Sequence, residues 1–345
     1  MSTAEDHVPG QYIPLHYHFQ MLLDRARVRG FREALARRVP QGGRVLELGG
    51  GTGVLSYFAA QRATKVWCVE RNAEVASAAE RFLARNGVAD RVEVICADAL
   101  TYLPPEPVDV VVCEMLHVGL LREKQIEVIA SFKERYGKKF GGLPLFVPEA
   151  TILAVQPVHY DFDFAGYEAP VSLFFDPLGP QEGVTELGGP LLYGTLLYDE
   201  SLPFAFNYRG TSRMVRAGTV NALRFITKNL LAILVEGRRT IDWHNQYLVL
   251  PVPEPARVEA GQNLEIRFAY RAGGSIESLT GAIEIVPGEF SEVAPVPGTG
   301  GGDCNAIGPD GPLVSHCGAV ANHVPARARA SAANTVTSLP QVSVI

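Results

Sequence analysis

Glu47-Leu48-Gly49-Gly50-Gly51-Thr52-Gly53 is the stretch that decides the fold of this chain. It follows the apolar run RVLEL (44–48), and an apolar segment with helical spacing begins near Val54. Glycines at the end of a parallel strand let backbone amides approach a ligand that a Cβ would exclude. The stretch therefore predicts a strand, a ligand-binding loop and a helix, in that order.

Strand-like and helix-like segments alternate after this loop, up to about residue 148. The further strand-like runs are KVWCVE (65–70), VEVICAD (92–98) and VDVVVCEML (108–116). The helix between the first two has a plausible N-cap at Asn72 and a stop signal at Asn86-Gly87. Such alternation is typical of a parallel sheet covered on both faces. We expect a Rossmann-like α/β domain over 41–148 and a helical segment over 1–40.

The pattern changes after residue 148. Short β-prone runs are broken by Pro and Gly at spacings typical of an antiparallel sandwich or barrel, and we expect an antiparallel β-barrel domain over 149–290. Residues 293–345 contain no aromatic residue, four charged residues and a GTGGG run, which is too little apolar material for a core. We therefore expect a low-complexity Gly/Ala-rich tail over 291–345.

Composition excludes several classes of protein. A net charge of −6, with 47% hydrophobic and 20% charged residues, is typical of a soluble globular protein and argues against a dedicated nucleic-acid binder. No apolar run approaches the roughly 18 residues of a membrane span, and the polar N-terminus does not look like a signal peptide, so we expect a cytoplasmic protein. The five cysteines are scattered and lack the paired spacing of a zinc site, so no metal is expected.

The glycine loop does not fit a dinucleotide site. The G-x-G-x-x-G fingerprint counted from Gly49 ends on Val54, whose side chain would obstruct close packing of helix on strand. The loop resembles instead the E-x-G-x-G-x-G signature of class I S-adenosylmethionine-dependent methyltransferases. The residues at its defining positions are Glu47, Gly49, Gly51 and Gly53. Taken alone, such a loop could also be only a tight turn.

Two further acidic residues support this resemblance. Glu70 ends the second strand-like run, where the resemblance implies that it accepts both ribose hydroxyls of S-adenosylmethionine. Asp98 ends the third run, near the expected adenine amino group, and Ala99 beside it belongs to the same expected cofactor site. Glu70 taken alone could still be a solvated strand end.

The fourth strand-like run is followed by Glu114 and, nine residues later, by Glu123, with Gly119 between them. Here the chain resembles the protein arginine methyltransferases, whose corresponding hairpin carries two glutamates that clamp the substrate guanidinium. Two carboxylates can form charge-assisted, bidentate bonds to such a planar cation. The resemblance also places Glu114 against the cofactor. Each acid taken singly could be an ordinary loop carboxylate.

The run HFQMLLDRAR (18–27) resembles the family's N-terminal helix pattern H-x-x-M-L-x-D-x-x-R. The resemblance implies that His18 and Met21 close over the cofactor and that Arg27 pairs with its carboxylate. It also implies that Tyr12 lines the site.

One departure from the family affects the expected active site. The family has a Thr-His-Trp loop whose histidine pairs with the aspartate matched here by Asp24, but this chain reads Ile241-Asp242-Trp243-His244. Asp24 and Asp242 would then be neighbours, which would raise the pKa of one of them unless a cation lies between them. Either His244 substitutes for the histidine, or the substrate is not a conventional arginine.

A second departure concerns assembly. The family's helical dimerisation arm belongs near 160–190, where this chain is punctuated by Pro and Gly and shows no clear helical period. A homodimer stays open, but dimerisation through such an arm is in doubt.

Together these patterns predict an S-adenosylmethionine-dependent methyltransferase that N-methylates arginine in a protein or peptide. The chain's own tail is one candidate substrate, because residues 326–330 read Ala-Arg-Ala-Arg-Ala. One alternative, favoured by Asp242, is the same scaffold methylating a nitrogen or oxygen of a small metabolite or biosynthetic peptide. Another is a non-catalytic binding module. Neither a nucleic acid nor a membrane is an expected partner.

Overall fold

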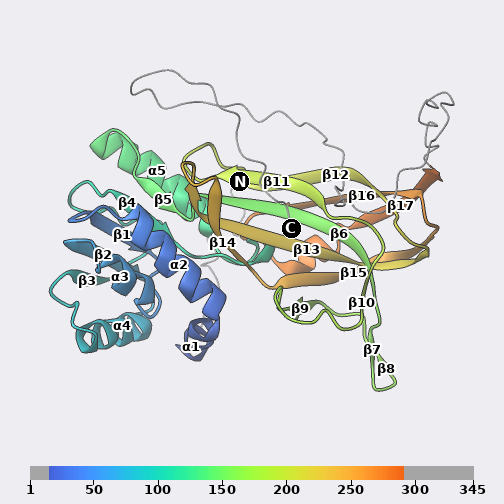
Figure 1. Cartoon of the computed structure of the whole chain (residues 1–345), viewed down its shortest axis with the longest axis horizontal. Coiled ribbons are helices and arrows are strands. Elements are labelled where there is room, and N and C mark those ends of the chain that lie inside the picture. Colours follow the sequence, from blue (N-terminus) through green and yellow to red (C-terminus); the bar gives the residue numbers. More distant parts are fainter. Residues whose placement is uncertain (1–14, 291–345) are drawn as a thin grey trace, which may run out of the picture. The chain divides into compact units, whose positions relative to one another are not determined.

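A parallel sheet forms one half of the structure, a computed structural model that describes residues 15–290 (Figure 1). Its five strands lie in the order β3-β2-β1-β4-β5. Their bounds are β1 Arg44–Leu48, β2 Lys65–Glu70, β3 Val92–Cys96, β4 Val110–Cys113 and β5 Leu145–Val147. The central strands are buried along nearly their whole length, as expected for a sheet covered on both faces. The predicted Rossmann-like core is confirmed, whereas the predicted tail lies outside the described residues.

Helices cover this sheet. They are α1 Leu15–Leu23, α2 Arg25–Arg38, α3 Val54–Ala59, α4 Ala73–Arg85, the 3-10 turn η2 Val118–Leu120 and α5 Gln125–Phe140. The predicted caps of α4 are present: the Asn72 side chain accepts hydrogen bonds from the amides of Glu74 and Val75, and Gly87 beyond the helix end has a φ of +69°. Local sequence signals therefore set the limits of this helix.

Antiparallel sheets form the other half. The larger has seven strands, with β10-β6-β13-β15-β9 in order, β11 added to β6 and β14 added to β13. A second sheet has the order β12-β16-β17, and β7 and β8 form a hairpin. The bounds of the first sheet are β6 Ala150–Tyr160, β9 Leu173–Phe175, β10 Val184–Glu186, β11 Leu191–Leu197, β13 Gly218–Leu234, β14 Arg239–His244 and β15 Tyr247–Val258. The remaining elements are β7 Asp163–Phe164, β8 Tyr167–Glu168, β12 Ala205–Arg213, β16 Gln262–Arg271, α6 Ile276–Thr280 and β17 Glu284–Phe290.

The predicted barrel is not confirmed. Hydrogen bonds join the strands between residues 150 and 290 into separate open sheets without a closed ring. The sheets nevertheless pack on one another, since the rings of Phe225 from β13 and Phe268 from β16 lie 5.2 Å apart. Antiparallel pairing was therefore readable from the sequence, but closure was not, because it depends on how edge strands meet in space.

Residues 160–190, where the family carries a helical arm and this sequence shows no helical period, consist of strands and turns. They contain the β7–β8 hairpin, which projects from the end of the long strands (Figure 1).

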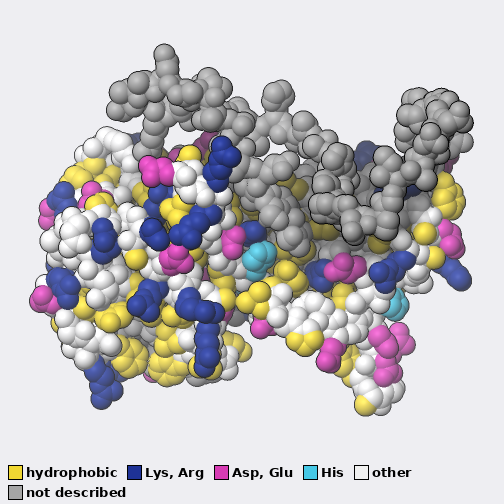
Figure 2. All heavy atoms as spheres, viewed as in Figure 1, with side chains coloured by type: hydrophobic (Ala, Val, Ile, Leu, Met, Phe, Trp, Pro, Cys, Tyr) yellow, Lys and Arg dark blue, Asp and Glu magenta, His cyan; other side chains and the backbone are white. Residues whose placement is uncertain are grey.

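The arginines of α2 that lie outside the site are mostly exposed, as expected for a solvated helix face. Figure 2 shows basic side chains spread over the surface of the half that contains the parallel sheet. None of the helices between residues 15 and 290 has the length and apolar character needed to cross a membrane.

One hydrophobic core joins the two halves. Phe31 of α2, Val111 of β4 and Phe225 of β13 are fully buried and belong to the same cluster. The α2 helix contributes directly to this junction, because the ring of Phe31 packs 6.3 Å from that of Trp243 on β14. The antiparallel sheets are thus fixed against the parallel sheet, which places their residues beside its carboxyl edge.

Substituting Phe132 tests the packing of α5. This side chain is fully buried, and its ring lies 4.9 Å from Tyr136 and 6.2 Å from Phe146 on β5. Phe132→Ala should lower the free energy of unfolding by about 3–5 kcal/mol, because it removes apolar contacts and leaves a cavity. Chemical denaturation measures the change. Glu134→Ala, at an exposed position on α5, serves as the control, and equal effects of the two substitutions would contradict the assigned packing.

Candidate active site

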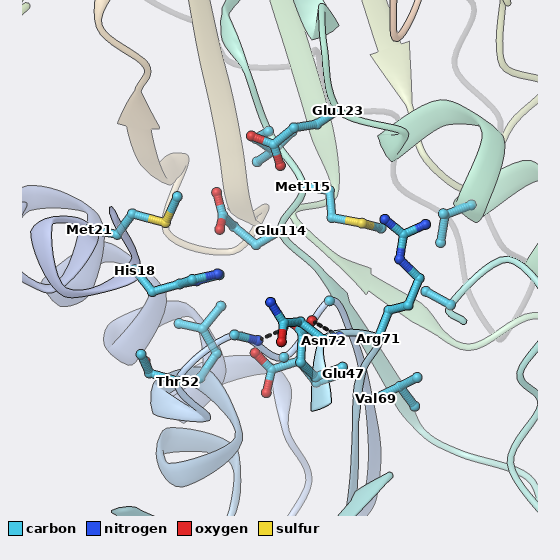
Figure 3. A pocket seen from close by; sticks show the side chains of 18 of the residues that line it. His18, Met21, Glu47, Thr52, Val69, Arg71, Asn72, Glu114, Met115 and Glu123 are labelled. Carbon is cyan, nitrogen blue, oxygen red and sulfur yellow. Dashed lines mark hydrogen bonds between the residues drawn. The ribbon is translucent and has the colours of Figure 1, made fainter. Parts of the chain in front are cut away.

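A cavity of about 670 Å³ opens at the carboxyl ends of β1 and β4 (Figure 3). The two strands are direct neighbours, with Leu48 opposite Cys113, whereas the chain leaves β1 toward β2 on the other side. Ligands of open parallel sheets bind at such a reversal of strand order. The cavity therefore lies where the fold itself favours a binding site.

All but one of the described residues expected to bind the cofactor line this cavity. They are His18, Met21, Arg27, Glu47, Gly49, Gly51, Glu70, Asp98, Ala99 and Glu114. Glu123 of the expected guanidinium clamp also lines it. Tyr12 lies outside the described residues. The exception, Gly53, has a φ of +78° and precedes α3, and a Cβ there would lie 3.0 Å from Leu83, so this glycine permits the turn and its packing.

The glycine loop keeps one wall of the cavity open. Gly49 and Gly51 have φ values of +79° and +53°, which glycine adopts without strain. A Cβ on Gly49 would lie 2.9 Å from Met115, and one on Gly51 would lie 3.0 Å from the His18 ring. The cradle thus depends on the absence of side chains at these two positions, which fits close contact with a ligand.

Glu70 is fixed beneath this loop by two hydrogen bonds. Its carboxylate accepts from the backbone amide of Gly51 at 3.0 Å and from that of Asn72 at 2.8 Å. Carboxylate oxygens have further acceptor sites, so Glu70 can also bind ligand hydroxyls. Asp98 is similarly held, because it accepts from the amide of Leu100 at 2.9 Å. Both carboxylates are therefore held in fixed positions at the wall of the cavity.

The N-terminal run forms two helices where the family pattern suggested one. Asp24 separates them and caps α2, since its side chain accepts from the Arg27 amide at 2.9 Å. His18 and Met21 on α1 point into the cavity in Figure 3. The helix α1 therefore forms a cover over the cavity.

Arg27 has a different partner from the one that the resemblance implies. In the structure its guanidinium donates to Glu114 Oε2, and it lies over the Trp243 ring at 5.4 Å from the ring centre. The expected partner of Arg27 was the carboxylate of the cofactor. Glu114 takes that place in the structure, with its side chain bonded to a guanidinium group.

Three carboxyl groups around the cavity have raised pKa values. Burial raises the pKa of Glu47 to about 8, and its carboxylate accepts from the Ser56 hydroxyl. Burial also raises the pKa of Glu114 to about 7 against the opposing effect of Arg27. For Glu123, burial and then the charge of Glu114 raise the pKa to about 8. The two glutamates are thus close enough to repel each other, and in Figure 3 they lie at the same end of the cavity.

The expected pair of Asp24 and Asp242 is not formed. Asp24 accepts a hydrogen bond from the indole nitrogen of Trp243 at 2.9 Å, whereas Asp242 pairs with Lys228 Nζ at 3.1 Å. Successive side chains on a strand point to opposite faces, so Trp243 takes the side that faces Asp24, and Asp242 and His244 take the other. Burial and Lys228 lower the pKa of His244. Neither Asp242 nor His244 lines the cavity, so the prediction of catalytic roles for them loses its structural support.

A buried glutamine at the start of α5 was not predicted as part of the site. Gln125 is fully buried and bonds the backbone on both sides of Glu114, to Cys113 O at 2.8 Å and from Met115 N at 3.0 Å. The available signal was a polar residue among the apolar residues of the inward face of this helix.

Comparison with known proteins agrees with this geometry. Residues 45–135 match a family model described as a methyltransferase domain. An uncharacterized protein of Methanothermobacter thermautotrophicus is 30% identical over 268 residues, which cover 77% of this chain and 97% of that protein. Protein arginine N-methyltransferase 6 of Xenopus laevis is 30% identical over 151 residues, which cover 43% of each chain. The chain belongs to the class I S-adenosylmethionine-dependent methyltransferases.

Solved structures share the fold of this methyltransferase. The Trypanosoma brucei PRMT1 enzyme–prozyme heterotetrameric complex with AdoHcy gives a TM-score of 0.62 at 16% identity, covering 80% of this chain and 98% of that chain. Protein arginine methyltransferase 10 of Arabidopsis thaliana, in an open conformation, also gives 0.62 at 18% identity, covering 74% and 87%. The parallel sheet followed by antiparallel sheets is thus shared with arginine methyltransferases.

Removing Glu70 should weaken binding of S-adenosylmethionine. Glu70→Ala removes the expected bonds to the ribose and the bond that holds the Gly51 amide, which should raise the dissociation constant about tenfold to 100-fold. Isothermal titration calorimetry measures this constant. Glu80→Ala, an exposed substitution on α4, should leave it unchanged. Equal affinity of Glu70→Ala and the unaltered protein would contradict the placement of Glu70.

The raised pKa of Glu123 predicts a pH effect on stability. Its pKa rises from 4.5 to about 8 on folding, so its contribution to the free energy of unfolding is present below pH 4.5 and is lost as the pH rises toward 8. Glu123→Gln should therefore flatten the decline in stability across this interval, as measured by denaturation at several pH values. Glu74→Gln, at an exposed position, should not. An equally steep decline in Glu123→Gln would show that the Glu123 pKa is not raised.

Proposed function

We propose that this methyltransferase N-methylates the guanidinium group of arginine in a protein or peptide. The observation that carries the proposal is the pair of buried glutamates at one end of the cavity. Arg27 and Arg122 lower the pKa of Glu123, yet burial and the charge of Glu114 outweigh them. Burial thus disfavours the ionised form of both carboxyl groups, and a cationic substrate beside them would stabilise their negative charge.

The shape of the cation also matters. Two carboxylates facing one planar guanidinium can each accept charge-assisted hydrogen bonds, which fixes the plane of the group as well as its position. Within this chain, Glu114 already accepts a hydrogen bond from one nitrogen of the Arg27 guanidinium. A lysine ammonium, a compact charge without a plane, would be held in a less defined orientation.

When bound, S-adenosylmethionine supplies an electrophilic methyl group on its sulfonium sulfur. The glutamates would orient one guanidinium nitrogen toward that methyl, and its lone pair would form the new N–C bond as the C–S bond breaks. Alignment of the two reactants is the main contribution required from the protein. The proton leaves the methylated nitrogen, and Glu123, with a pKa of about 8, is a suitable acceptor.

This assignment does not need a histidine at the active site. Asp24 is already bound by the Trp243 indole, so no imidazole is required to orient it. The main argument for a small-metabolite substrate was Asp242 in place of a histidine, and that argument weakens because Asp242 pairs with Lys228 away from the cavity. The named arginine methyltransferases among the relatives further support arginine as the substrate. Arg327 and Arg329 of the chain's own tail remain candidate sites.

Replacing either glutamate should abolish transfer while sparing the cofactor. Glu123→Gln keeps the shape of the side chain but removes its charge, which should lower turnover of an arginine peptide about 100-fold or more. Turnover by the unaltered protein should rise between pH 6 and 8, because deprotonated Glu114 and Glu123 bind the cation, with pKa values of about 7 and 8. Mass spectrometry of the peptide measures transfer, and calorimetry measures cofactor binding.

Two controls accompany this experiment. Glu134→Gln, exposed on α5, should leave turnover unchanged, and a matched peptide with lysine in place of arginine should not be methylated. Normal turnover in both Glu114→Gln and Glu123→Gln would refute the clamp. Cofactor binding without methylation of any arginine peptide, combined with methylation of a metabolite, would favour the small-molecule alternative.

A further inference from the structure

The segment 114–123, named here the glutamate loop, connects β4 to α5 and carries both glutamates. One side chain, that of Gln125, joins the two ends of this segment. Gln125 is fully buried at the start of α5. The Gln125 amide nitrogen donates to Cys113 O at 2.8 Å, and its oxygen accepts from Met115 N at 3.0 Å. Gln125 thus bonds the residues flanking Glu114 and stands two residues after Glu123. It ties the backbone at one glutamate to the backbone at the other.

The middle of the glutamate loop is held in a strained conformation. Leu120 and Arg122 have φ values of +55° and +62°, a region that residues with side chains rarely adopt, and Gly119 has a φ of +66°. Backbone strain of this kind persists only where the surrounding structure holds it, and it is concentrated at functional sites. The glutamate loop would therefore relax if its contacts were removed.

Residues of the antiparallel half supply those contacts. Thr227 Oγ1, on β13, accepts from the Gly119 amide at 2.7 Å, and the Tyr270 hydroxyl on β16 donates to the Gly119 carbonyl at 2.8 Å. The Asn245 side chain donates to the Leu116 carbonyl at 2.8 Å. Three side chains thus fix the backbone between the two glutamates.

Further buried hydrogen bonds hold the Asn245 side chain in place. Asn245 accepts from Asn229 at 2.8 Å, and Asn229 in turn accepts from Thr151 at 2.9 Å. All three side chains are buried, where an unmet hydrogen bond is costly, so each fixes its neighbour. The glutamate loop is therefore attached to a rigid part of the antiparallel sheet.

We propose that Gln125 and Thr227 are positioning residues that set the separation and orientation of the Glu114 and Glu123 carboxylates around the substrate guanidinium. This inference rests on the proposed arginine methylation. Gln125 acts at the two ends of the glutamate loop, and Thr227 acts at its centre. Gln125 also accepts from the Cys113 thiol at 3.3 Å. Neither Gln125 nor Thr227 lines the cavity, so both would act through the glutamate loop and not by touching the substrate.

The test uses the full chain and four substitutions. Gln125→Met keeps the length of the side chain but loses its hydrogen bonds, and Thr227→Val keeps the shape but loses the hydroxyl. Thr227→Ser restores the hydroxyl. Gln156→Met is the matched control, because Gln156 is also buried and donates to a backbone carbonyl, that of Gly188, at 2.9 Å on a different part of the sheet.

Turnover of an arginine peptide should fall about tenfold to 100-fold in Gln125→Met and Thr227→Val, because small displacements of reacting groups have effects of this size. Thr227→Ser and Gln156→Met should retain turnover, and calorimetry should show unchanged affinity for S-adenosylmethionine in all four. Melting temperatures identify any general loss of stability. Turnover in Gln125→Met and Thr227→Val equal to that of Gln156→Met would overturn the inference.

Amide hydrogen exchange gives a readout that does not require activity. Peptides covering 114–122 should exchange faster in Gln125→Met and Thr227→Val, because the Met115 and Gly119 amides lose their acceptors. The same peptides should be unaffected in Thr227→Ser and Gln156→Met. If the unaltered protein methylates no arginine peptide, the proposed function fails. Amide hydrogen exchange then tests by itself whether Gln125 and Thr227 hold the glutamate loop in place. Unchanged exchange in Gln125→Met and Thr227→Val would overturn that role.

Discussion

The burial of two carboxyl groups, Glu114 and Glu123, at one end of the cavity governs the chemistry proposed for this site. Both carboxyls are largely removed from water, and their pKa values rise to about 7 and 8. Arg27 offsets part of the charge of Glu114 from one side. Because burial disfavours the ionised form of both groups, a cation at this end of the cavity would stabilise them, and two acceptor groups favour a planar cation. Substrate choice and proton transfer in the proposed reaction both follow from this burial.

The fold supplies the means of holding two such groups together. Pairing of β1 with β4 places the glycine loop beside the strand that leads to Glu114, so the cofactor and substrate ends of the cavity adjoin. The antiparallel half contributes by a different route: Thr227 and Tyr270 bind the backbone at Gly119 between the two glutamates. In the proposed reaction one site uses both parts of the architecture, because the parallel sheet would bind the cofactor and the antiparallel sheets fix the loop that would orient the substrate.

Local signals in the sequence predicted the parts of this arrangement that depend on neighbours along the chain. The Asn72 cap and the glycine loop are examples, since turns and caps are determined by a few adjacent residues. The orientation of Asp242 was not predictable in the same way. It follows from the alternation along β14 and from pairing with β13, where the register shifts between Leu230 and Ala232. Whether the antiparallel strands close into a ring, and the bond of Thr227 to Gly119, likewise depend on contacts distant in sequence.

Binding of matched peptides tests the central claim most directly. One peptide contains arginine and its twin contains citrulline, which has nearly the same shape without the charge. Each is titrated calorimetrically at pH 7 into the protein saturated with S-adenosylhomocysteine, in two buffers of different ionisation enthalpy. The arginine peptide should bind more tightly and release protons, because its charge lowers the raised pKa values of Glu114 and Glu123. Equal binding of the two peptides, or binding of the arginine peptide without proton release, would contradict it.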